Sequence, residues 1–152
     1  MDSKLTTHSA QETHDLGRQV GSGLSGGENL LLCGDLGSGK TVFVQGLAEG
    51  LGVAGRVKSP TYTFLQEYEI PLRSTRLAHF DLYRLPDSPT PRQLETIELI
   101  ERLSDTDVIT AVEWADKIHH DGEGSYPIAF ETLADGSRKI VMPKSLLVPA
   151  AR

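Results

Sequence analysis

The chain has 152 residues, a formal net charge of −6 and a charged fraction of 24%. A chain of this length is expected to form one domain, and it leaves little room for a separate lid or substrate domain. The acidic balance argues against a large nucleic-acid surface, because phosphate contacts need clustered Lys and Arg, whereas the 15 basic residues here are scattered along the sequence.

The N-terminal segment predicts a polar end followed by a helix. Met1–Lys4 lead into a polar stretch without the apolar core of a secretory signal, and no apolar run in the chain approaches the length of a membrane span. We therefore expect a cytoplasmic protein without a membrane anchor. Residues 9–24 are expected to form the first helix, because Ser9 and Glu12 have the spacing of a capping box.

The next segment has the order of strand, glycine-rich loop and helix. The apolar run Leu30–Cys33 predicts a buried strand over residues 28–33, and Cys33, the single cysteine of the chain, is expected to be a small core residue within it. Residues 42–51 are expected to form a helix that ends at Gly52. The loop between them, Gly34-Asp35-Leu36-Gly37-Ser38-Gly39-Lys40-Thr41, matches the pattern G-x-x-x-x-G-K-[ST] at every defined position. We call these eight residues the phosphate loop.

The phosphate loop predicts a nucleoside triphosphate site. Glycines allow the backbone to wrap closely around an anion, so that main-chain N–H groups and the N-terminus of the following helix point at phosphate oxygens. Lys40 is expected to reach the β- and γ-phosphates, and the Thr41 hydroxyl is expected to be a magnesium ligand.

The rest of the chain predicts further strands and one more helix. The expected strands are 56–58, 63–70, 75–83, 108–113, 126–133 and 137–142, with the second and third forming one hairpin and the last two another. The helix is expected over 91–103, where Thr90, Pro91 and Gln93 have the pattern of a helix start. This alternation predicts an α/β P-loop NTPase fold, with a mainly parallel central sheet, antiparallel additions and flanking helices. We expect one ATPase domain over residues 1–152, with 1–6 and 145–152 as flexible ends.

Two acids are expected beside the loop. Glu113 ends the apolar run 108–112, and Asp81 ends a similar run that His79 interrupts. Open α/β sheets bind ligands at the carboxyl ends of their strands, and magnesium is commonly held there by carboxylate, hydroxyl, phosphate and water oxygens. The alternative for either acid is that it only caps a strand or pairs with an arginine.

Other features leave alternatives open. Ser59-Pro60-Thr61-Tyr62 is either a switch-like loop whose hydroxyls sense the γ-phosphate or an ordinary turn. Trp114 either stacks on a base or partner or packs at a strand end, and His119-His120 is expected to be a solvated surface. Asp121–Gly124 matches the D-x-x-G string of GTPases, but no strand precedes it and Asn29 is the only asparagine, so no N-K-x-D motif exists. GTP is therefore the less favoured nucleotide.

Four motifs in this order resemble the bacterial TsaE (YjeE) family of small ATPases. The match runs from about Thr7 to Met142, and the motifs are the phosphate loop, Val57–Tyr62, His79–Leu85 and Val112–Trp114. The phosphate loop occurs in many unrelated proteins, but the ordered set is specific. His79 belongs to the family's own string, so it does not weaken the assignment of Asp81.

The resemblance implies a role in making N6-threonylcarbamoyladenosine, next to the anticodon, on tRNAs that read codons starting with A. In this family the ATPase works with the proteins TsaD and TsaB, which bind the tRNA and transfer the threonylcarbamoyl group. The cofactors implied are ATP and Mg²⁺. By this resemblance Thr41 and Glu113 hold Mg²⁺, Asp81 and Lys40 serve hydrolysis, and ATP is bound by Leu36, Gly37, Ser38, Gly39, Lys40 and Thr41.

The chain departs from the family pattern in two places. Ser38 replaces the alanine common at that position, and the C-terminal hairpin is poorly patterned, although Arg138 near its turn could reach the nucleotide. The sequence offers no internal arginine finger, which is worth roughly a thousandfold or more in phosphoryl transfer. We therefore expect slow hydrolysis by the chain alone.

Two other functions fit a phosphate loop. One is a small-molecule kinase, for which Arg84, Arg92 and Arg102 would have to form a basic lid in a short segment. The other is an interaction module that binds nucleotide without turning it over.

Overall fold

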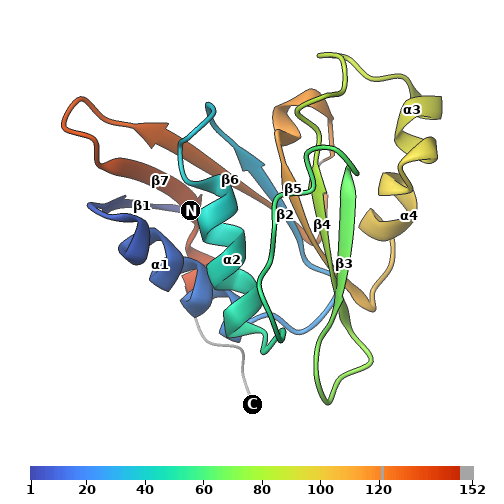
Figure 1. Cartoon of the computed structure of the whole chain (residues 1–152), viewed down its shortest axis with the longest axis horizontal. Coiled ribbons are helices and arrows are strands. Elements are labelled where there is room, and N and C mark those ends of the chain that lie inside the picture. The colour runs from blue at the N-terminus through green and yellow to red at the C-terminus, as the bar shows by residue number, and fades with distance from the viewer. Residues whose placement is uncertain (121, 148–152) are drawn as a thin grey trace.

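A seven-stranded sheet forms the centre of the protein (Figure 1). The computed structural model describes residues 1–120 and 122–147. Its strands are β1 (Asp2–Thr7), β2 (Asn29–Cys33), β3 (Leu65–Glu69), β4 (Arg76–Asp81), β5 (Val108–Glu113), β6 (Ser125–Thr132) and β7 (Arg138–Pro143). They lie in the order β1-β7-β6-β2-β5-β4-β3. The inner strands β6, β2, β5 and β4 are mutually parallel, while β3, β7 and β1 add antiparallel edges. The predicted α/β fold is confirmed.

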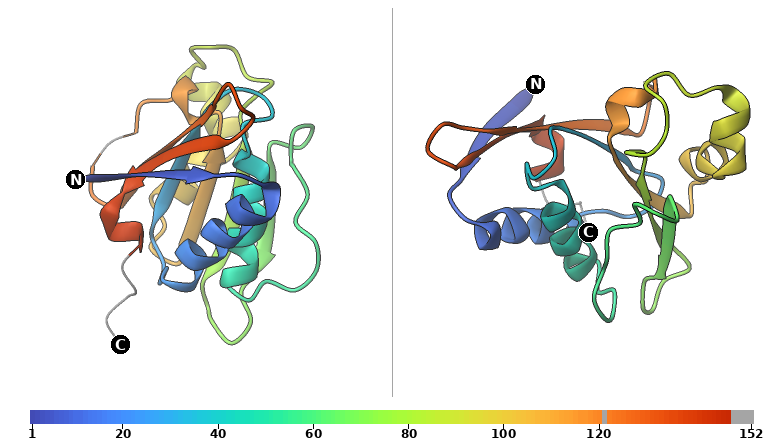
Figure 2. Two further views of the ribbon diagram at one scale, coloured as in Figure 1. Left: turned by 90° about the vertical axis from the view of Figure 1, so that its left-hand side faces the viewer. Right: turned by 45° about the horizontal axis from the view of Figure 1, so that its top comes forward.

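Helices cover both faces of the sheet. They are α1 (Ala10–Ser22), α2 (Lys40–Gly50), α3 (Pro91–Thr96) and α4 (Leu99–Leu103), with short 3₁₀ turns η1 (Ala115–Lys117) and η2 (Lys144–Leu147). The alternation of side chains along β2 separates two cores. Leu30 and Leu32 pack with α1 and α2, whereas Leu31 packs with α4 on the other side. In Figure 2, α1 and α2 form one group of helices, and α3 and α4 form a second group that is separate from it.

Helices α1 and α2 pack with almost no space between their backbones. A β-carbon added to Gly46 of α2 would lie 1.9 Å from the carbonyl oxygen of His14 in α1, and one added to Gly17 of α1 would lie 2.1 Å from that of Phe43. Gly21 and Gly50 extend the same contact. Because α2 follows the phosphate loop directly, this contact fixes the loop against α1.

Two predictions are wrong, one at the N-terminal end and one in the connection between α2 and β3. The sequence predicts a flexible end at residues 1–6, but residues 2–6 lie in β1, which pairs with β7 along its length. Leu5 of β1 packs against the main core, so pairing with a distant strand decides the structure of this segment. The expected strand 56–58 is irregular connection instead.

Other boundaries also move. The expected helix 91–103 breaks into α3 and α4 at Glu98, whose φ of 64° is left-handed. Both predicted hairpins are present, as β3–β4 and β6–β7, and the first is shorter than expected. At the C-terminal end, residues 145–147 lie in η2, and 148–152, with Asp121 of the D-x-x-G string, lie outside the described residues. In the described part of the chain, no helix has the length and apolar character that crossing a membrane requires.

Replacing Gly46 with alanine should destabilise the protein despite alanine's better helix propensity. The added methyl group would collide with the main-chain carbonyl of His14, and overpacking of this kind costs typically about 1–3 kcal/mol. Urea unfolding should show this loss for Gly46→Ala, while Gln19→Ala on the exposed side of α1 should stay near the parent value. Equal stability of the two variants would contradict the close helix contact.

Candidate functional site

The phosphate loop connects β2 to α2 at the carboxyl edge of the parallel strands. Gly34, Gly37 and Gly39 have positive φ values of 152°, 78° and 106°, and Gly39 in the left-handed region forms the N-cap of α2. No side chain of the described residues caps this end. The first main-chain N–H groups of α2 are therefore available to an anion at the point where the helix dipole favours negative charge.

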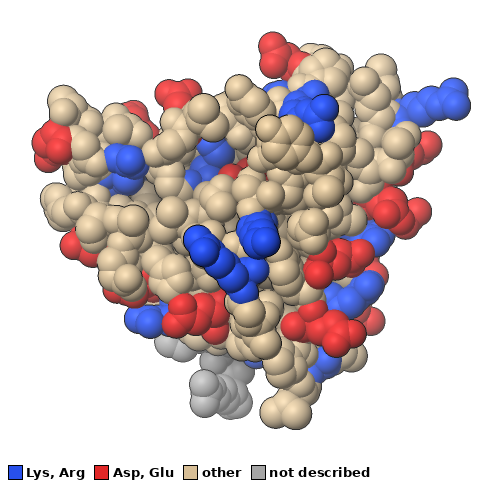
Figure 3. Space-filling view, in the orientation of Figure 1, with Lys and Arg blue, Asp and Glu red and all other residues tan. Residues whose placement is uncertain are grey.

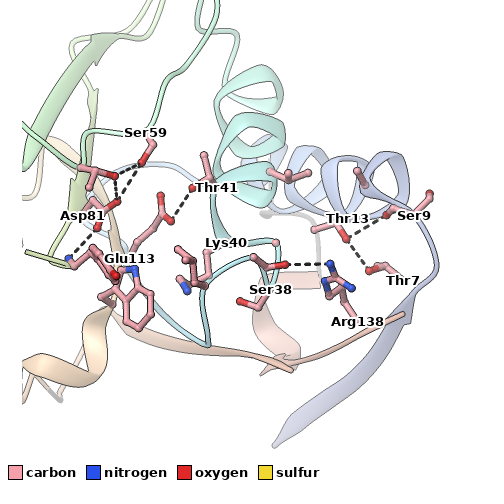
Figure 4. A pocket seen from close by; sticks show the side chains of 18 of the residues that line it. Thr7, Ser9, Thr13, Ser38, Lys40, Thr41, Ser59, Asp81, Glu113 and Arg138 are labelled. Atoms are coloured by element: carbon pink, nitrogen blue, oxygen red, sulfur yellow. Dashed lines mark hydrogen bonds between the residues drawn. The ribbon is translucent and has the colours of Figure 1, made fainter. Parts of the chain in front are cut away.

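A pocket of about 370 Å³ opens at this helix end. Figure 4 shows its two sides: Asp81, Glu113 and Ser59 lie on one side of Lys40, and Thr7, Ser9, Thr13 and Arg138 lie on the other. The pocket lies within the size range of about 300–1,000 Å³ that small ligands and cofactors occupy.

Lys40 occupies the middle of the pocket and is 4% exposed. Its ammonium group donates to the carbonyl oxygens of Gly34 and Asp35, the second at 3.0 Å, and lies 4.1 Å from the centre of the Trp114 ring. Burial lowers the pKa of Lys40, and the nearby carboxylate of Glu113 opposes that shift. A phosphate group entering the loop offers this cation a partner of opposite charge in place of neutral carbonyls.

The side chains of Thr41 and Glu113 meet at the start of α2. The Thr41 hydroxyl donates to Oε1 of Glu113 at 2.8 Å, and the Glu113 side chain is buried at the end of β5. Adjacent ligands of octahedral magnesium, each about 2.0–2.1 Å from the ion, lie about 2.9 Å apart. The two oxygens are thus spaced as neighbouring magnesium ligands would be.

The donor set near this pair fits magnesium better than a metal held by protein alone. Among the described residues there is no cluster of three or more His, Cys, Asp and Glu side chains that could hold a metal ion. Magnesium keeps several waters and commonly binds through one or two protein oxygens together with substrate phosphates. A hydroxyl and a carboxylate beside a phosphate loop match that preference.

Asp81 lies next to Glu113, as the parallel pairing of β4 and β5 requires. Its Oδ2 accepts hydrogen bonds from the hydroxyls of Ser59 at 3.1 Å and Thr61 at 2.8 Å, and its Oδ1 accepts from the main-chain N–H of Tyr83 at 2.9 Å. The segment Ser59–Tyr62, for which the sequence leaves a switch or a turn open, therefore folds against a strand-end acid. Ser59 and Thr61 line the pocket, and Figure 4 shows Ser59 beside Asp81.

The side of the pocket around α1 is largely missing from the sequence predictions. Thr7 at the end of β1 and Thr13 in α1 share a hydrogen bond of 2.7 Å between buried hydroxyls. Arg138 reaches across from β7 and donates to the carbonyl oxygens of Gly37, at 3.0 Å, and Gly136. The sequence points to Arg138 by its place near a turn, but no local pattern marks the threonines, because their position depends on β1 pairing with β7.

The remaining candidates divide between the pocket and the surface. Trp114 packs against Tyr83, with ring centres 5.0 Å apart, and lines the pocket, so packing and a ligand contact are both compatible with its position. Arg84 lies over the Tyr62 ring and Arg102 donates to Glu67. Neither arginine lines the pocket, where the cations among the described residues are Lys40 and Arg138.

The comparisons with known proteins all point to the same protein family. The family model described as "Threonylcarbamoyl adenosine biosynthesis protein TsaE" matches residues 7–140. The tRNA threonylcarbamoyladenosine biosynthesis protein TsaE of Haemophilus influenzae is 44% identical over 98 residues, which cover 64% of this chain and 56% of that protein. The protein of the same name from Treponema pallidum is 34% identical over 140 residues, covering 91% of this chain and 98% of that protein.

The fold agrees with this family. The crystal structure of Bacillus subtilis YdiB superposes with a TM-score of 0.70 at 27% sequence identity, covering 93% of this chain and 84% of that one. Together with the phosphate loop between β2 and α2, this similarity supports a P-loop NTPase fold. The chain belongs to the TsaE family, and its role lies in tRNA threonylcarbamoyladenosine biosynthesis.

Proposed function

We propose that the protein is a magnesium-dependent ATPase that acts with TsaD and TsaB in the threonylcarbamoylation of the adenosine next to the anticodon of tRNAs reading codons that start with A. The observation that supports hydrolysis most directly is the convergence of the phosphate loop, the Thr41–Glu113 pair and Asp81 on one pocket. These are the parts that phosphoryl transfer needs: a cradle for the phosphates, oxygens for a metal ion and a carboxylate near the reacting group.

The phosphates would bind between the loop and the start of α2, along residues 36–41. Lys40 is within reach of this space because its ammonium group already lies inside the loop. Thr41 and Glu113 would hold Mg²⁺, which when bound neutralises part of the phosphate charge.

Asp81 is proposed to orient the attacking water. It lies beside Glu113 at the strand ends, so a γ-phosphate held by Lys40 and the metal site would face it. In the structure described here its oxygens are occupied by the hydroxyls of Ser59 and Thr61 and by the Tyr83 N–H. A bound γ-phosphate offers those hydroxyls another acceptor, and Oδ2 of Asp81 would then be free to accept from water.

The nucleoside would occupy the other side of the pocket. This side, lined by Thr7, Ser9, Thr13 and Arg138, lies across the loop from Asp81 (Figure 4). A triphosphate with its γ-phosphate near Asp81 extends in this direction. Arg138 already donates to Gly37, so its guanidinium group lies where the first phosphate or the ribose would enter.

The charge distribution agrees with tRNA being bound through partners. On the face seen in Figure 3, Lys and Arg are interspersed with Asp and Glu, and they do not form one broad basic patch. A protein that holds tRNA by itself needs clustered cations. The net charge of −6 points the same way.

Replacing Lys40 with alanine should weaken ATP binding about ten- to hundredfold. The change removes charge-assisted contacts to phosphate, which are worth about 1.5–3 kcal/mol. Titration calorimetry with Mg·ATP measures the effect, and Lys139→Ala on β7, outside the pocket lining, provides a control with the same change in net charge. Equal affinities for Lys40→Ala and the parent chain would place the phosphates elsewhere.

Replacing Asp81 with asparagine should leave ATP affinity close to the parent value and reduce turnover by about a hundredfold or more, the usual scale for a positioned acid or base. Asp87→Asn, which changes an exposed acid between β4 and α3 and outside the pocket, should leave turnover unchanged. Parent-like turnover in Asp81→Asn would reduce Asp81 to a structural acid that orders the Ser59–Tyr62 segment.

Turnover should be slow for the chain alone and strongly stimulated by TsaD and TsaB together. Arg138 is engaged with main-chain carbonyls, and supplying a catalytic arginine or ordering the site is worth roughly a thousandfold or more. Steady-state phosphate release, measured with each partner and with both, tests this. Phosphate transfer to a metabolite without the partners would favour a kinase, and tight ATP binding without turnover in any mixture would favour a nucleotide-dependent interaction module.

A further inference from the structure

His79 is a fully buried histidine directly behind the proposed metal ligands. It lies on β4, two residues before Asp81, and its side chain is 0% exposed. Alternation along the strand directs Ala78 and Phe80 into the core beneath α4, whereas Leu77 packs in the core beneath α2. His79 shares the α2 side with Leu77, at a position where an apolar residue would complete the core.

His79 contacts one carboxylate oxygen of Glu113, and Thr41 contacts the other. The Nε2 of His79 lies 2.5 Å from Oε2 of Glu113, while Oε1 of the same carboxylate accepts from the Thr41 hydroxyl at 2.8 Å. Because His79 of β4 holds Oε2 and Thr41 of α2 holds Oε1, the two contacts together fix the orientation of the carboxylate. The contact with His79 is buried, so water does not compete for it, whereas the contact with Thr41 is only part-buried and borders the pocket.

The other ring nitrogen of His79 has no hydrogen-bond partner among the residues that the structure describes. Its Nδ1 is buried and makes no hydrogen bond with any described residue. A buried polar atom without a partner costs free energy, of the order of 1–3 kcal/mol. An apolar residue at this position would avoid that cost. The hydrogen bond to Glu113 is what His79 offers and an apolar residue does not.

We propose that His79 is a positioning residue for magnesium: it holds Oε2 of Glu113 so that Oε1 stays beside Thr41 at ligand spacing. This inference rests on the proposed function, since it requires Glu113 to be a metal ligand. Magnesium demands near-ideal octahedral geometry, so a carboxylate that can rotate binds it less well than one held in place. Groups behind the ligands typically account for about 10- to 100-fold in metal affinity.

The test separates the metal contribution from the rest of nucleotide binding. Affinity for a non-hydrolysable ATP analogue is measured by calorimetry in EDTA and across a magnesium titration, for the parent chain and for His79→Leu. We expect His79→Leu to match the parent in EDTA and to need about tenfold or more magnesium for the same gain in affinity. Thr110→Val, which removes a buried hydroxyl from β5 away from the pocket, is the control and should titrate like the parent.

A second pair of variants tests the role of Nε2 and covers the case in which His79→Leu does not fold. The side-chain amide of glutamine reaches the position of Nε2, whereas that of asparagine corresponds to Nδ1. His79→Gln should therefore keep most of the magnesium dependence and His79→Asn should lose it. In a Glu113→Gln background, substitution of His79 should cause no further change in the magnesium titration.

The outcomes distinguish this inference from the proposed function. A parent-like magnesium titration in His79→Leu, or equal titrations for the glutamine and asparagine variants, overturns the positioning role and leaves the ATPase proposal standing. Equal weakening in EDTA and in magnesium also overturns it, because a purely structural role would produce that result. If the parent chain itself gains no affinity from magnesium, both the metal site and the role of His79 are wrong.

Discussion

The parallel pairing of β2, β5 and β4 is the constraint on which the site depends. It places Leu32 of β2 opposite Glu113 of β5, and Asp81 of β4 opposite Glu113 in turn. The phosphate loop begins one residue after β2 ends, so both acids are brought to the loop by backbone hydrogen bonds rather than by their own contacts. Three strands far apart in sequence thus deliver a cradle and two carboxylates to one edge of the sheet.

The close packing of α1 on α2 extends this constraint to the other half of the pocket. Since the backbones touch at Gly17 and Gly46, α1 cannot shift along α2 without a clash. The N-terminus of α1, with Ser9 as its N-cap, is therefore fixed relative to the phosphate loop. Pairing of β1 with β7 then brings Thr7 and Arg138 to the same place, and the proposed nucleoside side is built from both chain ends.

Local patterns were enough to predict the phosphate loop, the strand before it, the helix after it and the acids that end β4 and β5. Each of these depends on neighbouring residues: glycine spacing, apolar runs and an acid at a strand end. The structure places Asp81, Glu113, Lys40 and Thr41 around one pocket, as expected. Their chemical roles are still predictions.

What local patterns could not predict depends on contacts between distant segments. β1 has only a weak alternation and forms because β7 is beside it. The break between α3 and α4 needs a left-handed Glu98, which nothing in its sequence neighbours requires. His79 is the clearest case: along the chain it interrupts an apolar strand, and only the position of Glu113 on the next strand gives its side chain a partner.

The buried charges of the pocket explain why metal and nucleotide would bind together. Lys40 faces two buried carboxylates, Asp81 and Glu113, each satisfied here by hydroxyl or main-chain donors or by His79. A polyphosphate entering without a cation would bring further negative charge next to both acids, where low polarity strengthens the repulsion. A divalent ion between the phosphates and Glu113 converts that repulsion into attraction. If the proposed ligand is correct, the same carboxylates that would disfavour metal-free polyphosphate would favour its magnesium complex.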